Sequence, residues 1–256
     1  MSSTVAKALK IIEAMSRNGD PVGISQIGRE LRLNKSTVFR LLDTLCRHGF
    51  ARKDPLTNAY HLTTRLWELG VGVLQQNRLR DLARPTMEAV TRETDETTML
   101  GIVQDEEALI VEKVASRAPL QIASPVGTRV PLHCSSIGRT LLAHMGDDVV
   151  DRVSRSMPRR TERTITTRAA LVAELARVRA QGVCECVDEW AVGVSGVAAP
   201  IRDHSGAVVG SICITGPTLR LAPERMPQLG LKVVDAAREI SGLMGHRDPQ
   251  GGRTRD

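Results

Sequence analysis

The chain has 256 residues, of which 41% are hydrophobic, and its 35 basic and 29 acidic residues give a net charge of +6. This length suits two domains, each with its own core. No apolar run approaches the roughly 18 residues that span a bilayer, and the N-terminus lacks a signal-peptide core, so we expect a cytoplasmic protein with no membrane partner. The five scattered cysteines, an odd number, are unlike a secreted disulfide framework.

The first 50 residues carry three runs of apolar residues at helical spacing, and each run predicts a short amphipathic helix. Ser25 and Asn34 are expected to cap the second and third helices, because their side-chain oxygens can accept hydrogen bonds from first-turn amides. Gly49 is expected to end the third. The apolar positions are Val5, Ala8, Leu9, Ile12 and Met15, then Ile24, Ile27 and Leu31, then Val38, Leu41, Leu42 and Leu45.

The second and third helices predict a helix-turn-helix. With the apolar face turned inward, Ser36, Thr37 and Arg40 face outward and Lys35 lies in the first turn. In helix-turn-helix proteins this part of the second helix of the motif reaches base edges, while hydroxyls and cations hold phosphates. The alternative is a charged, solvated helix in an ordinary helical domain.

Two strand-like runs, 50–53 and 59–62, flank the turn-forming cluster 54–58 and predict a hairpin with a basic first strand. Such a hairpin is the wing of a winged helix-turn-helix domain, which we assign to residues 1–62. Its cations would add affinity rather than sequence choice. We predict that double-stranded DNA is contacted by Ser25, Gln26, Lys35, Ser36, Thr37, Arg40, Arg52 and Lys53.

The charge distribution agrees with this assignment. Residues 1–80 contain 13 basic and 6 acidic residues, a net charge of +7, whereas residues 81–256 contain 22 and 23, a net charge of −1. The positive charge is therefore concentrated where DNA is expected.

Residues 63–78 predict a linker helix that can bend, since Leu66, Leu69, Val73 and Leu74 have helical spacing but Gly70 and Gly72 interrupt it. An apolar stripe without a core of its own suits a dimerisation element, because a two-fold operator needs two reading heads. The alternative is a helix packed on its own domain.

Residues 79–246 alternate strand-like and helix-like segments joined by short turns, which predicts an α+β domain with a mostly antiparallel sheet. The Gly-, Arg- and Asp-rich residues 247–256 predict a disordered tail. The strand candidates are 98–104, 108–114, 121–125, 184–188, 194–201 and 207–216, and the helix candidates are 82–94, 138–145, 169–181 and 223–243.

Three segments in this order resemble the IclR family of bacterial transcription regulators: RLLDTLCRHGF at 40–50, HCSSIGRTLLA at 133–143, and GVCECVDEWAVGVSGVAAPIRDHSGAVVGSICITGP at 182–217. The resemblance implies a dimeric or tetrameric DNA-binding regulator whose C-terminal domain resembles the GAF fold and binds a small metabolite. It also implies control of a catabolic operon by an organic or aromatic acid.

By the same resemblance, the effector pocket is formed by backbone amides before the 138–145 helix and by polar side chains of the last strands. Helix-start amides suit an anion, although serines there also serve as simple caps. Members that bind small keto acids have Asp, Cys and Ser where this chain has Cys186, Gly196 and Cys213, which predicts a roomier, softer pocket. The predicted effector-binding residues are Ser135, Ser136, Ile137, Cys186, Gly196, Cys213 and Thr215. Trp190, four residues after Cys186, is added to them, and the alternative for it is an amphipathic tryptophan half-buried on a loop.

Two other classes of function remain as alternatives. Cys184, Cys186 and Cys213, with His133 or His204, contain the groups for a zinc site or a redox switch, but the Cys-x-Cys spacing lacks the two-residue spacer of structural zinc motifs. A cysteine hydrolase would need a nucleophile elbow, a phosphate loop or a metal triad that the sequence does not show. We therefore expect a non-enzymatic repressor without metal or cofactor.

Overall fold

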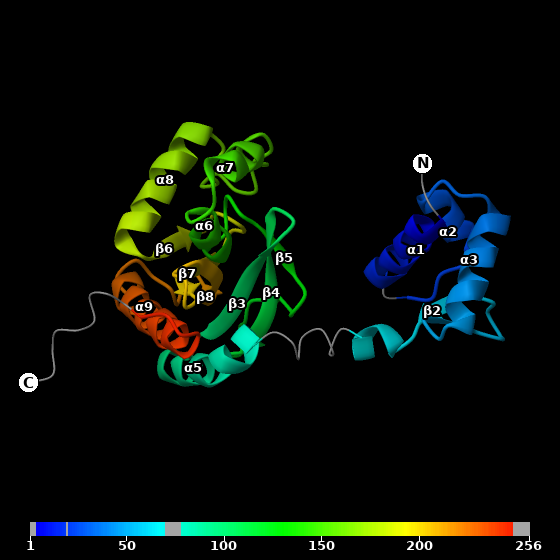
Figure 1. The fold of residues 1–256 in the computed structure, drawn as a ribbon, viewed down its shortest axis with the longest axis horizontal. Helices are drawn as coiled ribbons and strands as arrows, with labels where there is room; N and C mark the ends of the chain where they lie inside the picture. Colours follow the sequence, from blue (N-terminus) through cyan, green and yellow to red (C-terminus); the bar gives the residue numbers. More distant parts are fainter. Residues whose placement is uncertain (1–3, 19, 70–77, 248–256) are drawn as a thin grey trace, which may run out of the picture. The chain divides into compact units, whose positions relative to one another are not determined.

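The computed structural model describes residues 4–18, 20–69 and 78–247, and its contacts divide the chain into two compact units, Met1–Gln76 and Asn77–Asp256 (Figure 1). The predicted linker falls partly on residues 70–77 and the predicted tail mostly on 248–256, so these parts lie outside the described residues. Residues 65–69, which belong to the predicted linker, are helical. Each unit is described below by itself.

In unit 1, three helices and a hairpin precede the helix at 65–69 and share one core. Helices α1 (Thr4–Asn18), α2 (Ile24–Glu30) and α3 (Lys35–Arg47) are followed by the antiparallel strands β1 (Ala51–Lys53) and β2 (Tyr60–Leu62). Their apolar faces form one core that includes Ile11, Ile27, Val38, Leu42 and Tyr60. The winged helix-turn-helix fold predicted from apolar spacing is confirmed.

Of the two helix caps predicted from the sequence, the one at α3 is confirmed and the one at α2 is wrong. Asn34 caps α3, where its Oδ1 accepts hydrogen bonds from Thr37 N (2.8 Å) and the Ser36 hydroxyl (3.1 Å). Ser25 does not cap α2, because the extended Gly23 holds the N-cap position and its carbonyl accepts from Gln26 N and Ile27 N. That prediction was wrong by two residues, since a glycine also satisfies the geometry of an N-cap.

Unit 2 is built on a six-stranded antiparallel sheet in the order β5-β4-β3-β8-β7-β6. The strands are β3 (Thr97–Gln104), β4 (Glu107–Val114), β5 (Arg129–Pro131), β6 (Cys184–Val187), β7 (Val194–Arg202) and β8 (Val208–Pro217). The helices are α5 (Arg78–Thr94), α6 (Ser136–Leu142), α7 (Asp147–Ser154), α8 (Arg168–Gln181) and α9 (Met226–Leu243). The predicted α+β class with an antiparallel sheet is confirmed.

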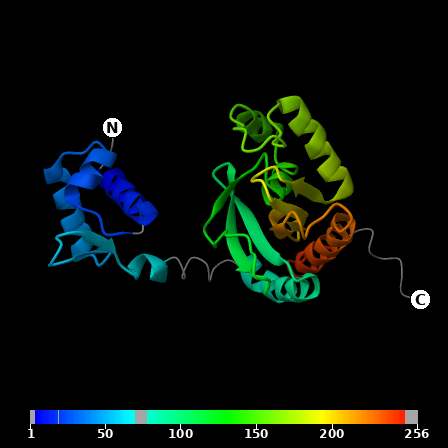
Figure 2. The same cartoon turned by 180° about the vertical axis from the view of Figure 1, so that it is seen from behind.

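The sheet of unit 2 is covered on both faces (Figures 1 and 2). Helices α5 and α9 pack on one face, and α6 with α7 and α8 lies on the other. Because strand residues alternate between faces, Ile212 and Ile214 of β8 join the α5/α9 core, whereas Cys213 joins the α6 core. The same alternation places Cys184 and Cys186 of β6 on the α6 side.

Three segments of unit 2 differ from the sequence prediction, and one of them is the strand β5 (Arg129–Pro131), which was not predicted. The predicted strand at 121–125 is absent. The Ile122 carbonyl there accepts a hydrogen bond from Lys113 Nζ (2.8 Å), and the side-chain amide of Gln121 donates to the carbonyls of Ser116 and Ala118. The helix α7 was missed, although Gly146 before two aspartates and the spacing of Val150 and Val153 are signals of a helix start and an apolar face. None of the described helices has the length and apolar character that crossing a bilayer requires.

Candidate functional site

The eight residues predicted to contact DNA lie on α2, α3 and β1, and seven of them are exposed. Thr37, whose amide is bound to Asn34, is half-buried. The core side of α3 holds Val38 and Leu42, so Ser36 and Arg40 lie on the opposite, outer side.

The cations of this surface are available to a ligand. Within the described part of unit 1, ion pairs join Arg17 with Glu30, Arg47 with Asp43 and Arg65 with Glu68, and His61 lies 3.9 Å from Asp54. None of these pairs includes Lys35, Arg40, Arg52 or Lys53. Four exposed cations without an internal counter-ion suit a polyanion such as the DNA backbone.

The wing is a tight hairpin whose turn is held by one carboxylate. Asp54 Oδ1 accepts hydrogen bonds from Leu56 N (2.7 Å) and Thr57 N (2.9 Å), which lowers the pKa of the Asp54 carboxyl. Asn58 has a φ of 59°, a conformation that asparagine tolerates better than most residues. The hairpin therefore presents Arg52 and Lys53 on a fixed strand.

Unit 2 contains a cavity of about 60 Å³ between the sheet and the start of α6. Its wall includes all eight residues predicted to bind an effector, which come from the α6 start, β6, the loop after β6, β7 and β8. The structure thus brings together positions up to 80 residues apart in sequence (135 to 215). A volume of this size has room for roughly four to six water molecules. The remaining lining residues are Met99, Ile110, Ile122, Ser124, Val130, Cys134, Val194 and Ser195.

The polar groups of the cavity are hydroxyls and thiols. Ser135 caps α6, since its Oγ accepts from Gly138 N (3.0 Å) and donates to the Pro131 carbonyl (2.7 Å). The Ser136 hydroxyl lies 3.2 Å from Cys213 Sγ, and the Thr215 hydroxyl donates to the Ser195 carbonyl (2.9 Å). Among the described residues that line the cavity, none carries a charged side chain.

The thiols of the cavity are held in the neutral form. Burial raises the pKa of Cys134 to about 11 and that of Cys213 to about 12. The pKa of Cys186 is raised well above its usual value, mainly by a hydrogen bond with Cys184 and secondly by burial. Protonated thiols are poor nucleophiles, so these cysteines act as small, weakly polar wall groups.

Gly196 lies close to two polar groups of the cavity wall. A Cβ at this position would lie 2.8 Å from Ser136 Oγ and 3.3 Å from Cys213 Sγ. The Ser136 hydroxyl thus occupies the space that a side chain at position 196 would need. Cys186 and Cys213, on which the prediction of a softer pocket rests, both line the cavity.

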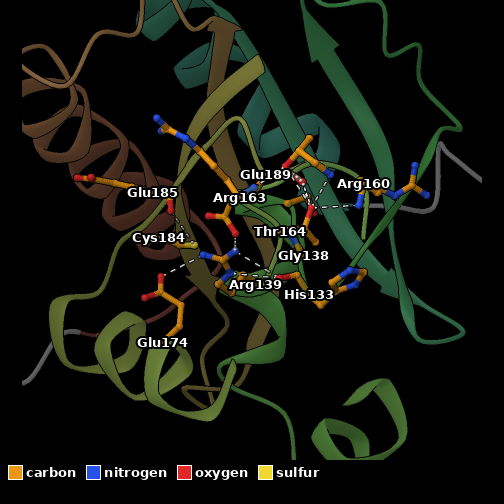
Figure 3. Close-up of polar contacts among 12 residues, drawn as sticks. His133, Gly138, Arg139, Arg160, Arg163, Thr164, Glu174, Cys184, Glu185 and Glu189 are labelled. Carbon is orange, nitrogen blue, oxygen red and sulfur yellow. Dashed lines mark hydrogen bonds and ion pairs between the residues drawn. The ribbon is translucent and has the colours of Figure 1, made fainter. Parts of the chain in front are cut away.

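A buried guanidinium that the sequence analysis missed ties the cavity wall together (Figure 3). Arg139 of α6 is 1% exposed and pairs with Glu189 and with Glu174 of α8 (3.1 Å). It also donates from Nε (3.4 Å) and Nη2 (3.3 Å) to the His133 carbonyl. Since Ser135 follows His133 by two residues and Trp190 follows Glu189, one side chain joins both wall segments to α8.

The loop that carries Trp190 is fixed at further points. Asp188 Oδ1 accepts from Gly193 N (2.8 Å) and from the Thr218 hydroxyl (2.6 Å), which closes the loop on itself and on the end of β8. The Glu189 carbonyl accepts from the Thr164 hydroxyl (2.8 Å). The sequence signals for this network were Arg139 in the segment HCSSIGRTLLA and the pair Asp188-Glu189 in the segment that begins at Gly182, both of which carried the family resemblance.

The described residues hold no group of three His, Cys, Asp or Glu side chains placed to bind a metal ion. The thiol groups that were considered for a zinc site or a redox switch, Cys184, Cys186 and Cys213, are buried in the α6-side core.

Comparison with known proteins agrees with this geometry. Residues 4–55 match the family model of the IclR helix-turn-helix domain, and residues 71–242 match that of the bacterial transcriptional regulator IclR C-terminal domain. The HTH-type transcriptional regulator KdgR of Escherichia coli is 34% identical over 248 residues, which cover 96% of this chain and 94% of that protein. The HTH-type transcriptional repressor AllR of Salmonella typhi is 28% identical over 97% of this chain and 92% of that protein.

A solved structure has the same fold over both units. The crystal structure of an IclR homolog complexed with 4-hydroxybenzoate, from Microbacterium hydrocarbonoxydans, is 29% identical and superposes with a TM-score of 0.83. The match covers 94% of this chain and 98% of that one. The chain therefore belongs to the IclR family of bacterial transcriptional regulators.

Proposed function

We propose that this chain is a repressor of a catabolic operon and that a small organic or aromatic acid, bound in the cavity of unit 2, controls its affinity for an operator. The observation that carries this proposal is the convergence of the eight predicted effector residues on one cavity in the unit that lacks the helix-turn-helix. Two relatives support the class: AllR is named a repressor, and the Microbacterium homolog holds 4-hydroxybenzoate.

On the DNA side, we propose that Lys35, Ser36, Thr37 and Arg40 read the major groove, and that Ser25, Gln26, Arg52 and Lys53 hold phosphates beside it. The exposure of this surface and its unpaired cations support the assignment. The protein would work in the cytoplasm, where its DNA target lies.

The proposed binding mode for the acid follows from the polar groups of the cavity. A carboxylate would be held by the Ser136 hydroxyl and the first-turn amides of Ser136 and Ile137, because the first amides of a helix have no partner within it. The body of the ligand would pack against Met99, Ile110 and Trp190. A small planar acid fits this division between one polar wall and several apolar ones.

We propose a homodimer, or a tetramer of two dimers, as the DNA-binding form, since a two-fold operator needs two reading heads. Unit 1 leaves large apolar side chains exposed outside its DNA surface, which supports self-association: Val5 and Leu9, one turn apart on α1, and Trp67 and Leu69 in the helix at 65–69. An effector that prefers one spacing of the reading heads would shift operator affinity by typically 1 to 3 kcal/mol.

Two measurements on the full-length protein test the proposal. Thermal unfolding with a panel of small carboxylic acids, 4-hydroxybenzoate included, should show a rise in the midpoint for at least one acid. The same acid should then change the mobility shift of DNA from the flanks of the protein's own gene. Ser136→Leu should abolish both effects of the acid while the protein still binds DNA, and Ser156→Leu at an exposed site is the matched control. A panel in which no acid changes either readout would contradict the proposed ligand class.

A further inference from the structure

Only two phenylalanines occur in the chain, and the structure uses them differently. Phe50 is partly buried against the core of unit 1. Phe39, on α3, is 50% exposed although an aromatic side chain gains most from burial. An exposed aromatic ring in the second turn of a recognition helix therefore needs an explanation that the core does not give.

Phe39 lies on the outer side of α3. Lys35 and Ser36 precede it by four and three residues, and such neighbours share one helix face. Arg40 follows directly, and Val38 and Leu42 turn to the core. The ring thus stands among the residues proposed to face the major groove.

The surroundings of Phe39 select the kind of partner. On its helix face lie Lys35, Ser36 and Asp43, and Arg40 is adjacent in sequence. Asp43 pairs with Arg47, whereas Lys35 and Arg40 take part in none of the ion pairs found in the described part of unit 1. The other large exposed apolar residues described in this unit lie on different elements, at Val5, Leu9, Leu56, Trp67 and Leu69. The Phe39 ring is thus a single apolar group on a largely basic surface. Such a surface would complement a polyanion that carries isolated apolar groups.

The major groove of DNA offers such a group. Its edge is made of hydrogen-bond donors and acceptors except for the C5-methyl group of thymine, which apolar side chains contact. We propose that Phe39 is a specificity-determining residue that packs on a thymine methyl of the operator. This inference rests on the proposed placement of α3 in the groove, and it adds a base preference that Lys35 and Arg40 do not supply.

The first part of the test alters the DNA and leaves the protein unchanged, by removing the C5-methyl group of thymine. Operator duplexes are first selected from fragmented genomic DNA of the source organism with the unaltered protein. Each thymine is then replaced singly by deoxyuridine, which differs only by that methyl. We expect one thymine per half-site at which the replacement weakens binding about fourfold, the effect of one buried methyl-sized group.

The protein arm uses Phe39→Ala, with Arg40→Ala as the matched neighbour. Phe39→Ala should bind non-operator DNA like the parent, weaken operator binding, and lose the deoxyuridine effect at that thymine. Arg40→Ala should weaken operator binding but keep the deoxyuridine effect. Phe39→Ala is expected to fold because the ring contributes little to the core, and circular dichroism checks this.

The outcomes distinguish the proposed contact of Phe39 with a thymine methyl from the proposed placement of α3 in the major groove. If Phe39→Ala keeps the full deoxyuridine sensitivity of the parent, or if no thymine is sensitive, the methyl contact is rejected while the recognition helix stands. If Arg40→Ala and Phe39→Ala both bind the operator like the parent, the placement of α3 in the groove is itself rejected.

Discussion

Arg139 and Glu189 form a buried ion pair that joins the start of α6 to the loop carrying Trp190. Their side chains are 1% and 12% exposed. Glu174 of α8, which also pairs with Arg177 at 2.7 Å, provides the second carboxylate for the same guanidinium. Two of the segments that Arg139 joins line the cavity, so the pair sets how the polar start of α6 and the indole of Trp190 face each other.

Arg139→Met should be strongly destabilising, because removing one partner of a buried ion pair leaves an uncompensated charge. We expect the free energy of unfolding to fall by about 3 to 5 kcal/mol, measured by urea denaturation. The matched control is Arg168→Met, which breaks the exposed pair of Arg168 with Asp151. That change should cost less than about 1 kcal/mol, as exposed pairs do. Equal losses in the two variants would show that the Arg139 network is ordinary surface charge.

The sequence could not predict this network, for a physical reason. Residues 139, 174 and 189 belong to three segments whose contact depends on the packing of α6 against α8, and local patterns carry no information about it. An arginine in a helix is most often exposed, so pattern reasoning assigns it to the surface. The buried charge becomes visible only when the tertiary contacts are known.

Other parts of the fold were predictable because their signals are local. Asn34 marks the start of α3, and Val38 and Leu42 mark its inner face. All three signals lie within nine consecutive residues, 34–42. The cavity depended instead on family resemblance, since Ser136 and Cys213 lie 77 residues apart yet make a 3.2 Å contact. The strand at 121–125 failed because alternation in a short run cannot tell whether a partner strand lies beside it.

Arg40→Ala and Arg52→Ala should weaken DNA binding in different ways. Arg40 lies on the outer face of α3, and its loss should cost about 1 to 3 kcal/mol of operator affinity and relax the base preference at one position. Arg52 lies on the wing, and its loss should weaken binding to all sequences equally and reduce the salt slope by about one. Fluorescence anisotropy at several salt concentrations, with operator and random duplexes, measures both effects. If both variants changed the salt slope and the preference for operator over random DNA equally, the separate roles assigned to Arg40 and Arg52 would be refuted.

Gly196→Ala should destabilise unit 2, because the added Cβ would lie 2.8 Å from Ser136 Oγ. Overpacking of this kind costs about 1 to 3 kcal/mol. Ser136→Gly removes the opposing hydroxyl, so the double variant should regain most of the loss, as residues in direct contact are coupled. Thermal unfolding of the parent, both single variants and the double variant gives this coupling. If the two changes were simply additive, the close approach of Gly196 to Ser136 would be wrong.

The stability of unit 2 should decrease as the pH falls from about 6.5 to about 4, because of the half-buried His144. Burial, together with Arg202 and Arg179, lowers the pKa of His144 to about 4, and its Nε2 atom is buried with no hydrogen-bond partner in the described structure. In the unfolded chain this group titrates near 6.5. In this interval the unfolded state therefore binds a proton that the folded state does not, and the free energy of unfolding decreases as pH falls.

The expected loss for His144 is at most about 3 kcal/mol, from the difference of the two pKa values. His133, whose pKa is also lowered chiefly by burial, acts in the same direction. Urea denaturation at several pH values from 7.5 to 4 measures the slope. His144→Leu should flatten it, because an apolar side chain leaves no orphaned nitrogen and binds no proton, whereas His48→Ala at an exposed position should retain the parent's slope. A His144→Leu variant with the full slope would assign the acid sensitivity to other groups, since below pH 6.5 only a group protonated more readily in the unfolded chain can produce it.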